Sequence, residues 1–380
     1  MPQADPSINK PKDANWYPPW APRFWHGMRI GDYFDLLREN RFEIHPARIP
    51  MAVLITGCAA FNSTLAVLQR HFFGERIESA RLKGPPVFII GHWRSGTTLM
   101  HELISMDPRY AFPSNFDAFL PHHFLVSRSI LYPLIKLLMP SKRPMDNMAL
   151  NVASPQEDDF ALCAYGAPTP YRRIAFPNRP NENHLQLNFD SADERIQNEV
   201  REAMTDFLQS LTVRYGKPLV LKSPPHTGRL RQLAEWFPDA KFIHMSREPS
   251  SLVLSTMRLW RLLDDVNGFQ LPKYDDDWLK SYVHECKDQM YSSYLQDRDS
   301  LPSNRIAEVR FEDLVANPID TVGEIYQQLE LGDFSGVQPK IETYFDQKRG
   351  HKKNKFDIPD SLQQEIVDRW SDYREAFGYE

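Results

Sequence analysis

Residues 91–98, Gly-His-Trp-Arg-Ser-Gly-Thr-Thr, have the residue types and spacing of a loop that binds phosphate. Gly91 and Gly96 let the backbone turn tightly, so that several N–H groups can point at one anion. A helix that begins after Gly96 would add the positive end of its dipole. The hydroxyl donors of the segment are Ser95, Thr97 and Thr98. The pattern has the outline of a P-loop.

The segment differs from the P-loop of a nucleotide hydrolase or kinase at two points. Those proteins have Lys directly after the second glycine, where this chain has Thr97, and the cation here, Arg94, lies inside the loop. They also hold Mg²⁺ with a carboxylate at the end of a neighbouring strand. The apolar segment 241–246 is instead followed by Arg247. We therefore expect the loop to bind a phosphate-like group without a metal.

Two further cations stand where strands are predicted to end. Lys222 ends one apolar segment, and Arg247 follows the next, with Ser255 about two turns into the helix that comes after it. Parallel strands present ligand-binding groups at their carboxyl ends. The sequence thus predicts two anion sites, the loop 91–98 and Arg247 with Ser255. A nucleoside with phosphate groups on both sides fits these sites better than ATP does.

The elements that must position these residues alternate between strands and helices. The predicted strands are the apolar segments 87–90, 218–222, 241–246 and 305–311. The predicted helices include 97–106, a helix from a capping box of Ser191 and Glu194 to Gly216, and a last helix from Asp360 with Leu362, Ile366, Trp370, Tyr373 and Phe377 inward. Such alternation indicates a parallel sheet. We predict an α/β, P-loop-type, three-layer fold with a central parallel sheet flanked by helices.

The first 83 residues differ in character from the rest, and we predict an N-terminal extension over 1–83 and a main domain over 84–380. Residues 1–48 are rich in proline and aromatic residues, a composition that disfavours a helix. Residues 50–69 carry no charge over about the length of a membrane span, but polar residues interrupt them. We favour a buried or membrane-surface helix over a span. Residues 107–188 are expected to be irregular, with an apolar stretch at 130–139 broken by Pro133 and Lys136.

The composition excludes several classes of protein. Hydrophobic residues make up 42% and charged residues 25% of the chain, which is typical of globular proteins and excludes a disordered or fibrous one. The net charge of -5 argues against a nucleic-acid partner. The three cysteines, Cys58, Cys163 and Cys286, are too far apart for a zinc site of the usual spacing. We expect a reducing, cytoplasmic location and see no secretory signal at the start of the sequence.

Three of these motifs resemble those of the sulfotransferase superfamily, whose members use 3′-phosphoadenosine 5′-phosphosulfate (PAPS). In that family a [KR]SGTT loop after a strand binds the 5′-phosphosulfate, and WRSGTT at 93–98 is similar to it. An Arg at a strand end, followed eight residues later by Ser, binds the 3′-phosphate in the family. Arg247 and Ser255 have that spacing. FEDL at 311–314 resembles the family's [YF]EDL.

Four further segments resemble a bacterial branch that includes sulfotransferases of lipid-like alcohols. They are PRFWHGM (22–28), SPQED (154–158), LKSPPH (221–226) and KRGHKKNKF (348–356). The resemblance therefore runs from about residue 22 to the end of the chain. It implies a transfer of the sulfuryl group to a hydroxyl, less readily an amine, of a small-molecule or lipid-like acceptor.

Sulfuryl transfer requires cations at the leaving phosphate and a base for the proton of the acceptor. The resemblance indicates Arg94 and Lys222 as the cations. Cytosolic members carry a basic His two residues after that Lys, where this chain has Pro224 and then His226 four residues on. Other members use Glu, and Glu157 is the second candidate. Glu157 could instead lie on a solvated helix start, and His226 could contact a hydroxyl or phosphate without proton transfer.

The basic run 348–354 has two interpretations. The resemblance indicates that Arg349, Lys352 or Lys353 closes over the 3′-phosphate, whereas charge runs in general are simply solvated.

Two alternatives to a PAPS-dependent sulfotransferase remain at the level of sequence. One is a P-loop kinase, and the other is a membrane-surface binding protein that keeps the fold without activity. The apolar segments 50–69 and 119–139 would form an apolar acceptor pocket, a membrane-facing mouth or plain core. Contact with a membrane through 50–69 is the corresponding expectation.

Overall fold

A parallel sheet lies at the centre of the computed structural model, which describes residues 21–138, 151–179, 186–348 and 360–379. Its strands are β1 (Val87–Ile90), β2 (Val220–Lys222), β3 (Lys241–Ser246) and β4 (Ile306–Arg310), in the order β2-β1-β3-β4. All four coincide with predicted strands to within two residues at each end. The predicted parallel α/β sheet is confirmed.

The register of the sheet brings the predicted site residues to one edge. Lys222, the last residue of β2, pairs with Ile89, and β1 ends one residue later. Ile90 in turn pairs with His244 of β3, two residues before that strand ends. Because parallel strands end at the same edge, Lys222, the loop after β1 and Arg247 after β3 lie on one side of the sheet.

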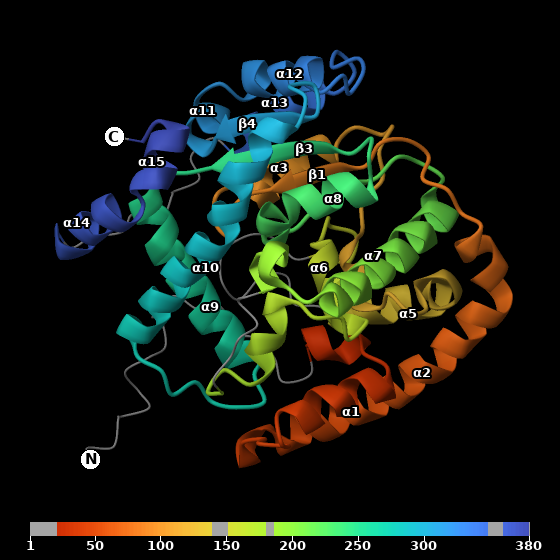
Figure 1. Cartoon of the computed structure of the whole chain (residues 1–380). Coiled ribbons are helices and arrows are strands. Elements are labelled where there is room, and N and C mark those ends of the chain that lie inside the picture. Colours follow the sequence, from red (N-terminus) through yellow and green to blue (C-terminus); the bar gives the residue numbers. More distant parts are fainter. Residues whose placement is uncertain (1–20, 139–150, 180–185, 349–359, 380) are drawn as a thin grey trace.

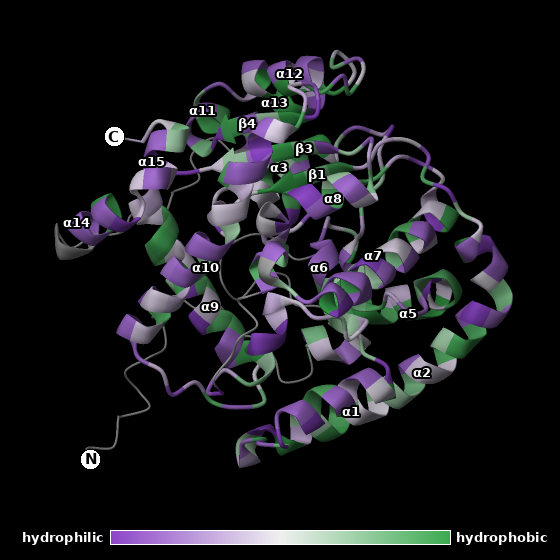
Figure 2. Ribbon diagram, viewed as in Figure 1, coloured by the Kyte–Doolittle hydropathy of each residue, from purple (hydrophilic) through white to green (hydrophobic). Residues whose placement is uncertain are grey.

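Both faces of the sheet are covered by helices, as predicted for a three-layer fold (Figure 1). Val87 and Ile89 belong to a buried cluster that includes side chains of the helices on one face. These helices are α3 (Thr97–Ile104), α12 (Pro318–Gln328) and α13 (Gln338–Lys348). Phe88 and Ile90 belong to a second, larger cluster on the other face. Its helices include α7 (Glu194–Tyr215), α8 (Leu230–Trp236), α9 (Pro249–Asn267) and α10 (Asp276–Asp297). The strand β1 is hydrophobic along its whole length (Figure 2) because both of its faces are buried.

The N-terminal part packs on the same larger cluster. It contains a turn η1 (Phe24–Gly27), helix α1 (Ile30–Glu39), a turn η2 (Pro46–Arg48) and helix α2 (Ile49–Glu78). The prediction that residues 1–48 contain no helix is wrong for α1, because Pro22 and Pro46 lie outside that helix. Trp25 and Tyr33 are fully buried in the cluster. The domain boundary at residue 83 stays a prediction.

Helix α2 is longer and more exposed than the sequence suggested. Among the described residues, the helical range Pro46–Glu78 is the one that is long and apolar enough to cross a membrane. An 18-residue window within it has a mean hydropathy of 1.8, and 22% of that window is buried. It runs along the outside of the molecule beside α1 and α5 (Figure 1). The interpretation of 50–69 as a buried helix is therefore wrong, and the interpretation as a surface helix remains.

The segment 107–188 contains more helix than predicted. Its helices are α4 (Asn115–Phe119), α5 (Phe124–Leu138) and α6 (Asp158–Ala164), followed by the turn η3 (Pro170–Ala175). Helix α5 continues through Pro133, which was expected to break it. Proline has no N–H, so the carbonyl of Ser129, four residues before Pro133, lacks its partner in the helix. Both residues are exposed, so water can bond to that carbonyl.

The boundaries of α7 and of the last predicted helix differ in part from the prediction. Asp193 caps α7 by accepting a hydrogen bond from the Arg195 amide, so the predicted capping box of Ser191 and Glu194 is wrong. Gly216 ends that helix in the left-handed region, as predicted. The last predicted helix is in fact two, α14 (Asp360–Arg369) and α15 (Ser371–Phe377). Of the side chains predicted to face inward there, Ile366, Trp370, Tyr373 and Phe377 are buried, and that of Leu362 lies outside the described ones. The remaining elements are η5 (Phe189–Ser191), η6 (Pro224–Arg229), η7 (Arg298–Ser300) and α11 (Phe311–Ala316).

Candidate active site

The loop after β1 has the conformation that its glycines allow. Gly91 and Gly96 have φ values of +136° and +104°. A Cβ atom at Gly96 would lie 2.4 Å from the ring of Phe311, the first residue of the FEDL segment, so only glycine fits there. The amide of Gly91 donates to the hydroxyl of Thr227 at 2.7 Å, which ties the loop to the turn η6. Helix α3 begins directly afterwards at Thr97.

The loop holds a buried donor that suits an anion. The hydroxyl Oγ of Ser95 is buried and has no hydrogen-bond partner among the described residues. A buried hydroxyl without a partner is costly in a folded protein. Together with the start of α3, this hydroxyl fits a phosphate or sulfate oxygen in the loop.

The two predicted anion sites lie next to each other. Nε of Arg94 donates to Oγ of Ser255 at 2.9 Å, and Nη1 of Arg247 donates to the carbonyl of Arg94 at 2.9 Å. Burial, and next the charge of Arg94, lowers the pKa of Arg247. Two close guanidinium groups of like charge would be stabilised by an anion between them. The guanidinium of Arg247 also lies 4.6 Å from the ring centre of Phe311.

A pocket of about 310 Å³ opens beside Arg247. It is lined by Arg247, Ser251, Phe311, Glu312, Val315 and Ala316. The FEDL segment therefore supplies one wall of this pocket and also packs against the phosphate loop through Phe311.

Glu157 and Lys222 form a buried ion pair. Nζ of Lys222 lies 2.5 Å from Oε1 of Glu157, and the hydroxyl of Tyr171 donates to Oε2. Tyr171 in turn accepts a hydrogen bond of 2.8 Å from the indole of Trp93, a residue of the phosphate loop. Burial, and next the Glu157 carboxylate, raises the pKa of Tyr171 well above its ordinary value, so the phenol keeps its proton. The alternative that Glu157 lies on a solvated surface is wrong.

Three consecutive acidic residues at the start of α6 each pair with a base that follows or ends β2. Besides Glu157 with Lys222, Oδ2 of Asp158 lies 2.6 Å from Nε2 of His226, and Oδ1 of Asp159 lies 2.7 Å from Nη1 of Arg229. The first two pairs join the segments SPQED (154–158) and LKSPPH (221–226), and the third pair lies just beyond them. Burial alone would raise the pKa of Asp158. The contact with His226 and the hydrogen bond from Ser223 outweigh burial, so the pKa is lowered overall.

His226 is placed differently from Glu157. Its side chain is fully buried, bonds to Asp158 and meets the ring of Phe88 edge to face. Nδ1 of His226 has no hydrogen-bond partner in the described parts of the chain. The ring therefore supports the first turn of α6, whereas Glu157 is the candidate base that contacts the candidate cation directly.

Sequence reasoning missed four residues of this network. Asp158 and Thr227 lay one residue from predicted site residues, which was a usable signal. Tyr171 and the role of Trp93 had none, because their contacts connect segments far apart in the chain. Among the predicted cofactor residues, Thr97 is buried and Thr98 half-buried at the start of α3. Arg349, Lys352 and Lys353 lie outside the described residues.

A parallel sheet with a loop of the P-loop type after β1, and with cations at the ends of its neighbouring strands, is the arrangement expected of an enzyme that transfers a group from a nucleotide. The model of the sulfotransferase family matches residues 85–335. The chain belongs to this family. It is therefore a sulfotransferase, and the kinase alternative is excluded.

Individual relatives come from mycobacteria. The omega-hydroxy-beta-dihydromenaquinone-9 sulfotransferases Stf3 of Mycobacterium tuberculosis and Mycobacterium bovis are each 35% identical over 364 residues, covering 95% of this chain and 92% of theirs. The crystal structure of sulfotransferase STF9 from Mycobacterium avium has a TM-score of 0.67 at 17% identity, over 93% of this chain and 97% of that one. Sulfotransferase STF1 of Mycobacterium tuberculosis has a TM-score of 0.56 at 16% identity, over 84% and 88%. The two structures support the fold.

Proposed function

We propose that this sulfotransferase moves the sulfuryl group of PAPS to the hydroxyl of a lipid-like acceptor, with Glu157 as the general base. The observation that carries the proposal is the buried contact of Glu157 with Lys222, linked through Tyr171 and Trp93 to the phosphate loop. A base and a cation in contact are what a proton transfer coupled to loss of a phosphate requires.

The donor would be held by the loop and by the cations beside it. Backbone amides of Ser95 and Gly96 and the hydroxyls of Thr97 and Thr98 are assigned to the 5′-phosphosulfate. The buried hydroxyl of Ser95, which has no partner in the part of the chain that the structure describes, supports this assignment. The residues assigned to the 3′-phosphate are Arg247 and Ser255, with Arg349, Lys352 and Lys353 from the basic run.

The reaction requires a proton acceptor and hydrogen-bond donors to the leaving phosphate from this chain. Glu157 accepts the proton of the acceptor hydroxyl as the new S–O bond forms, and the old bond from sulfur to the phosphate oxygen breaks in line. Lys222 and Arg94 donate to the leaving phosphate, whose charge grows as that bond breaks. Tyr171 holds the second oxygen of Glu157, so the carboxylate keeps its orientation. His226 is assigned a positioning role through Asp158.

A lipid-like acceptor is supported by the relatives named for a menaquinone and by the surface of α2. Seven large hydrophobic residues of α2 are exposed, and we call them the apolar stripe: Ile49, Val53, Leu54, Phe61, Val67, Leu68 and Phe72. The polar side chains of Asn62 and Gln69 are buried on the opposite side and bond to His26, Met28 and the start of α5. A helix in water has the reverse arrangement. We therefore assign the stripe to peripheral contact with the cytoplasmic face of a membrane.

Two measurements test the proposal. Adenosine 3′,5′-bisphosphate should raise the melting temperature more than ATP does, with or without EDTA, because binding to the native state stabilises it. Transfer from labelled PAPS should favour long-chain alcohols over short ones. Stabilisation that disappears with the chelator, or transfer to amines alone, would show the proposal to be wrong.

A further inference from the structure

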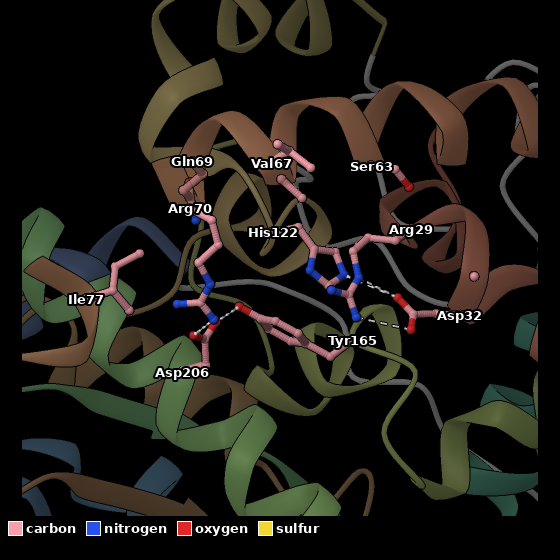
Figure 3. A pocket seen from close by; sticks show the side chains of 12 residues that line it. Arg29, Asp32, Ser63, Val67, Gln69, Arg70, Ile77, His122, Tyr165 and Asp206 are labelled. Atoms are coloured by element: carbon pink, nitrogen blue, oxygen red, sulfur yellow. Dashed lines mark hydrogen bonds and ion pairs between the residues drawn. The ribbon is translucent and has the colours of Figure 1, made fainter. Parts of the chain in front are cut away.

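A second pocket lies beside α2, and no residue of the loop 91–98 lines it. Its volume is about 450 Å³. Its walls come from α1, α2, the segment before α5, the C-terminal end of α6 and the middle of α7 (Figure 3). Tyr165, which lines it, follows the C-terminal end of α6, whereas Glu157 precedes the N-terminal end of the same helix. No residue of the donor site described above lines this pocket.

The walls carry two cations and two anions in alternation. Arg29 bonds to Asp32 through Nε at 2.8 Å and Nη2 at 3.2 Å. Arg70 bonds to Asp206 at 2.6 Å, and the hydroxyl of Tyr165 donates to the other oxygen of Asp206 at 2.8 Å. The side chains of Arg29 and Arg70 remain 45% and 52% exposed, so a ligand can reach both guanidinium groups.

The histidine between the two pairs adds no charge. His122 lies between Arg29 and Tyr165 in Figure 3 and bonds to the carbonyl of Ala164 at 3.0 Å. Burial, and next the charge of Arg29, lowers the pKa of His122 to about 3. The ring is therefore neutral at pH 7, and the pocket has equal numbers of positive and negative groups.

The balance of charge selects a ligand that carries both signs. A simple anion would gain from Arg29 and Arg70 but be repelled by Asp32 and Asp206, and a simple cation would have the opposite difficulty. A phosphate joined to an ammonium satisfies both. A primary ammonium donates hydrogen bonds to carboxylates, whereas a quaternary ammonium is held by cages of Trp, Tyr and Phe. Among the described residues, Tyr165 is the only one of these three types that lines the pocket.

The position of the pocket points to a lipid as the carrier of these groups. Four of its lining residues, Ser63, Ala66, Val67 and Arg70, lie on one side of α2 at helical spacing. Val67 also belongs to the apolar stripe and is 69% exposed. Acyl chains packed along the stripe would therefore bring a headgroup to the mouth of this pocket.

We propose that the pocket binds the headgroup of phosphatidylethanolamine, with the phosphate on Arg29 and Arg70 and the ammonium on Asp32 and Asp206. The proposal rests on the proposed membrane contact of α2 but not on the donor site or on Glu157. Binding there would fix how the enzyme lies on the membrane from which its acceptor is taken.

The experiment measures sedimentation of the full chain with vesicles of three compositions: phosphatidylcholine alone, with added phosphatidylethanolamine, and with added phosphatidylglycerol. We expect about tenfold tighter binding to the phosphatidylethanolamine vesicles, the scale of one charge-assisted hydrogen bond. The variant Arg29→Gln/Arg70→Gln should bind all three compositions alike. Arg38→Gln is the matched control, since Arg38 forms the same i,i+3 pair on α1 with Asp35 but lines no part of this pocket.

A second variant, which gives the pocket a net positive charge, provides a further test. Asp32→Asn with Asp206→Asn leaves two cations and should move the preference to phosphatidylglycerol, a change that mere unfolding would not produce. Soluble glycerophosphoethanolamine should compete with the vesicles, and inorganic phosphate at the same concentration should not. Equal binding of all vesicles by the unaltered chain, a preference kept by the arginine variant, or competition by phosphate alone would overturn the proposal. Transfer to a detergent-dissolved alcohol reports separately on the proposed function, since it needs no vesicle.

Discussion

The ammonium of Lys222 lies 2.5 Å from Oε1 of Glu157, although the two residues are 65 positions apart in the chain. Both are largely removed from water, and Tyr171 occupies the other carboxylate oxygen. A charge buried in this way is stable only beside an opposite charge, so removing either partner would leave the other uncompensated. The pair can therefore supply a proton acceptor and a cation at the same place.

Glu157→Gln is expected to lower kcat by about 10²–10⁴, because glutamine keeps the size but cannot accept the proton. The affinity for adenosine 3′,5′-bisphosphate should hardly change, since Glu157 contacts Lys222 and Tyr171 rather than the loop. Steady-state kinetics and calorimetry check the two halves. Tyr171→Phe is the companion variant, and its loss of kcat should be smaller. A loss below about tenfold for Glu157→Gln at saturating acceptor would exclude it as the base.

His226→Asn is expected to act first on stability. It removes the ring nitrogen that bonds to buried Asp158, and leaving a buried charged group short of a partner costs on the order of 1–3 kcal/mol or more. Thermal unfolding measures this loss. The double variant His226→Asn/Asp158→Asn should lose less than the sum of the single variants, because it removes the unpaired charge. An unchanged melting temperature with a rate that falls as pH drops through the imidazole range would assign the base to His226 instead.

Arg247→Ala is expected to weaken binding of adenosine 3′,5′-bisphosphate by about 1.5–3 kcal/mol, the scale of a charge-assisted hydrogen bond. The loss should be much smaller for adenosine 5′-phosphosulfate, which lacks the 3′-phosphate. Titration calorimetry with both nucleotides makes the comparison. Equal losses would place Arg247 at another part of the donor.

The buried histidines predict a protein that loses stability in mild acid. Burial lowers the pKa of His101, His122 and His244 to about 3 in each case. Their unfolded pKa is about 6.5, so the unfolded chain binds more protons between pH 6.5 and 3. The contribution of these histidines to the free energy of unfolding is therefore fully present above pH 6.5. It falls by up to about 1.4 kcal/mol per histidine for each pH unit below that value.

Melting temperatures between pH 8 and pH 5 check this dependence. His244→Phe should make the melting temperature depend less on pH. Phenylalanine keeps an aromatic ring against Tyr294 and Phe377 but has no site for a proton. His71→Gln is the control, since His71 is exposed on α2. A slope that is the same in His244→Phe as in the parent chain would contradict the explanation.

The local features of this protein could be predicted from its sequence. Four short apolar segments became the four strands, and the loop 91–98 took the turn that Gly91 and Gly96 allow. Parallel strands buried on both faces read as continuous apolar runs, and a phosphate loop follows from glycine positions and a helix start. These properties depend on neighbours in sequence. For the same reason Gly216 ends α7 where expected.

Tertiary structure alone decided which side chains meet. The sequence left Glu157 and His226 as equal candidates, because an ion pair between residues 65 positions apart leaves no local pattern. It gave no sign of Tyr171 for a similar reason, since Trp93 and Tyr171 are 78 positions apart. It also left open whether residues 50–69 face the core. Only the packing of α2 shows that Asn62 and Gln69 turn inward to bonded partners while the apolar stripe turns outward. Which face of a helix is covered depends on what the rest of the chain places against it, and local composition does not carry that information.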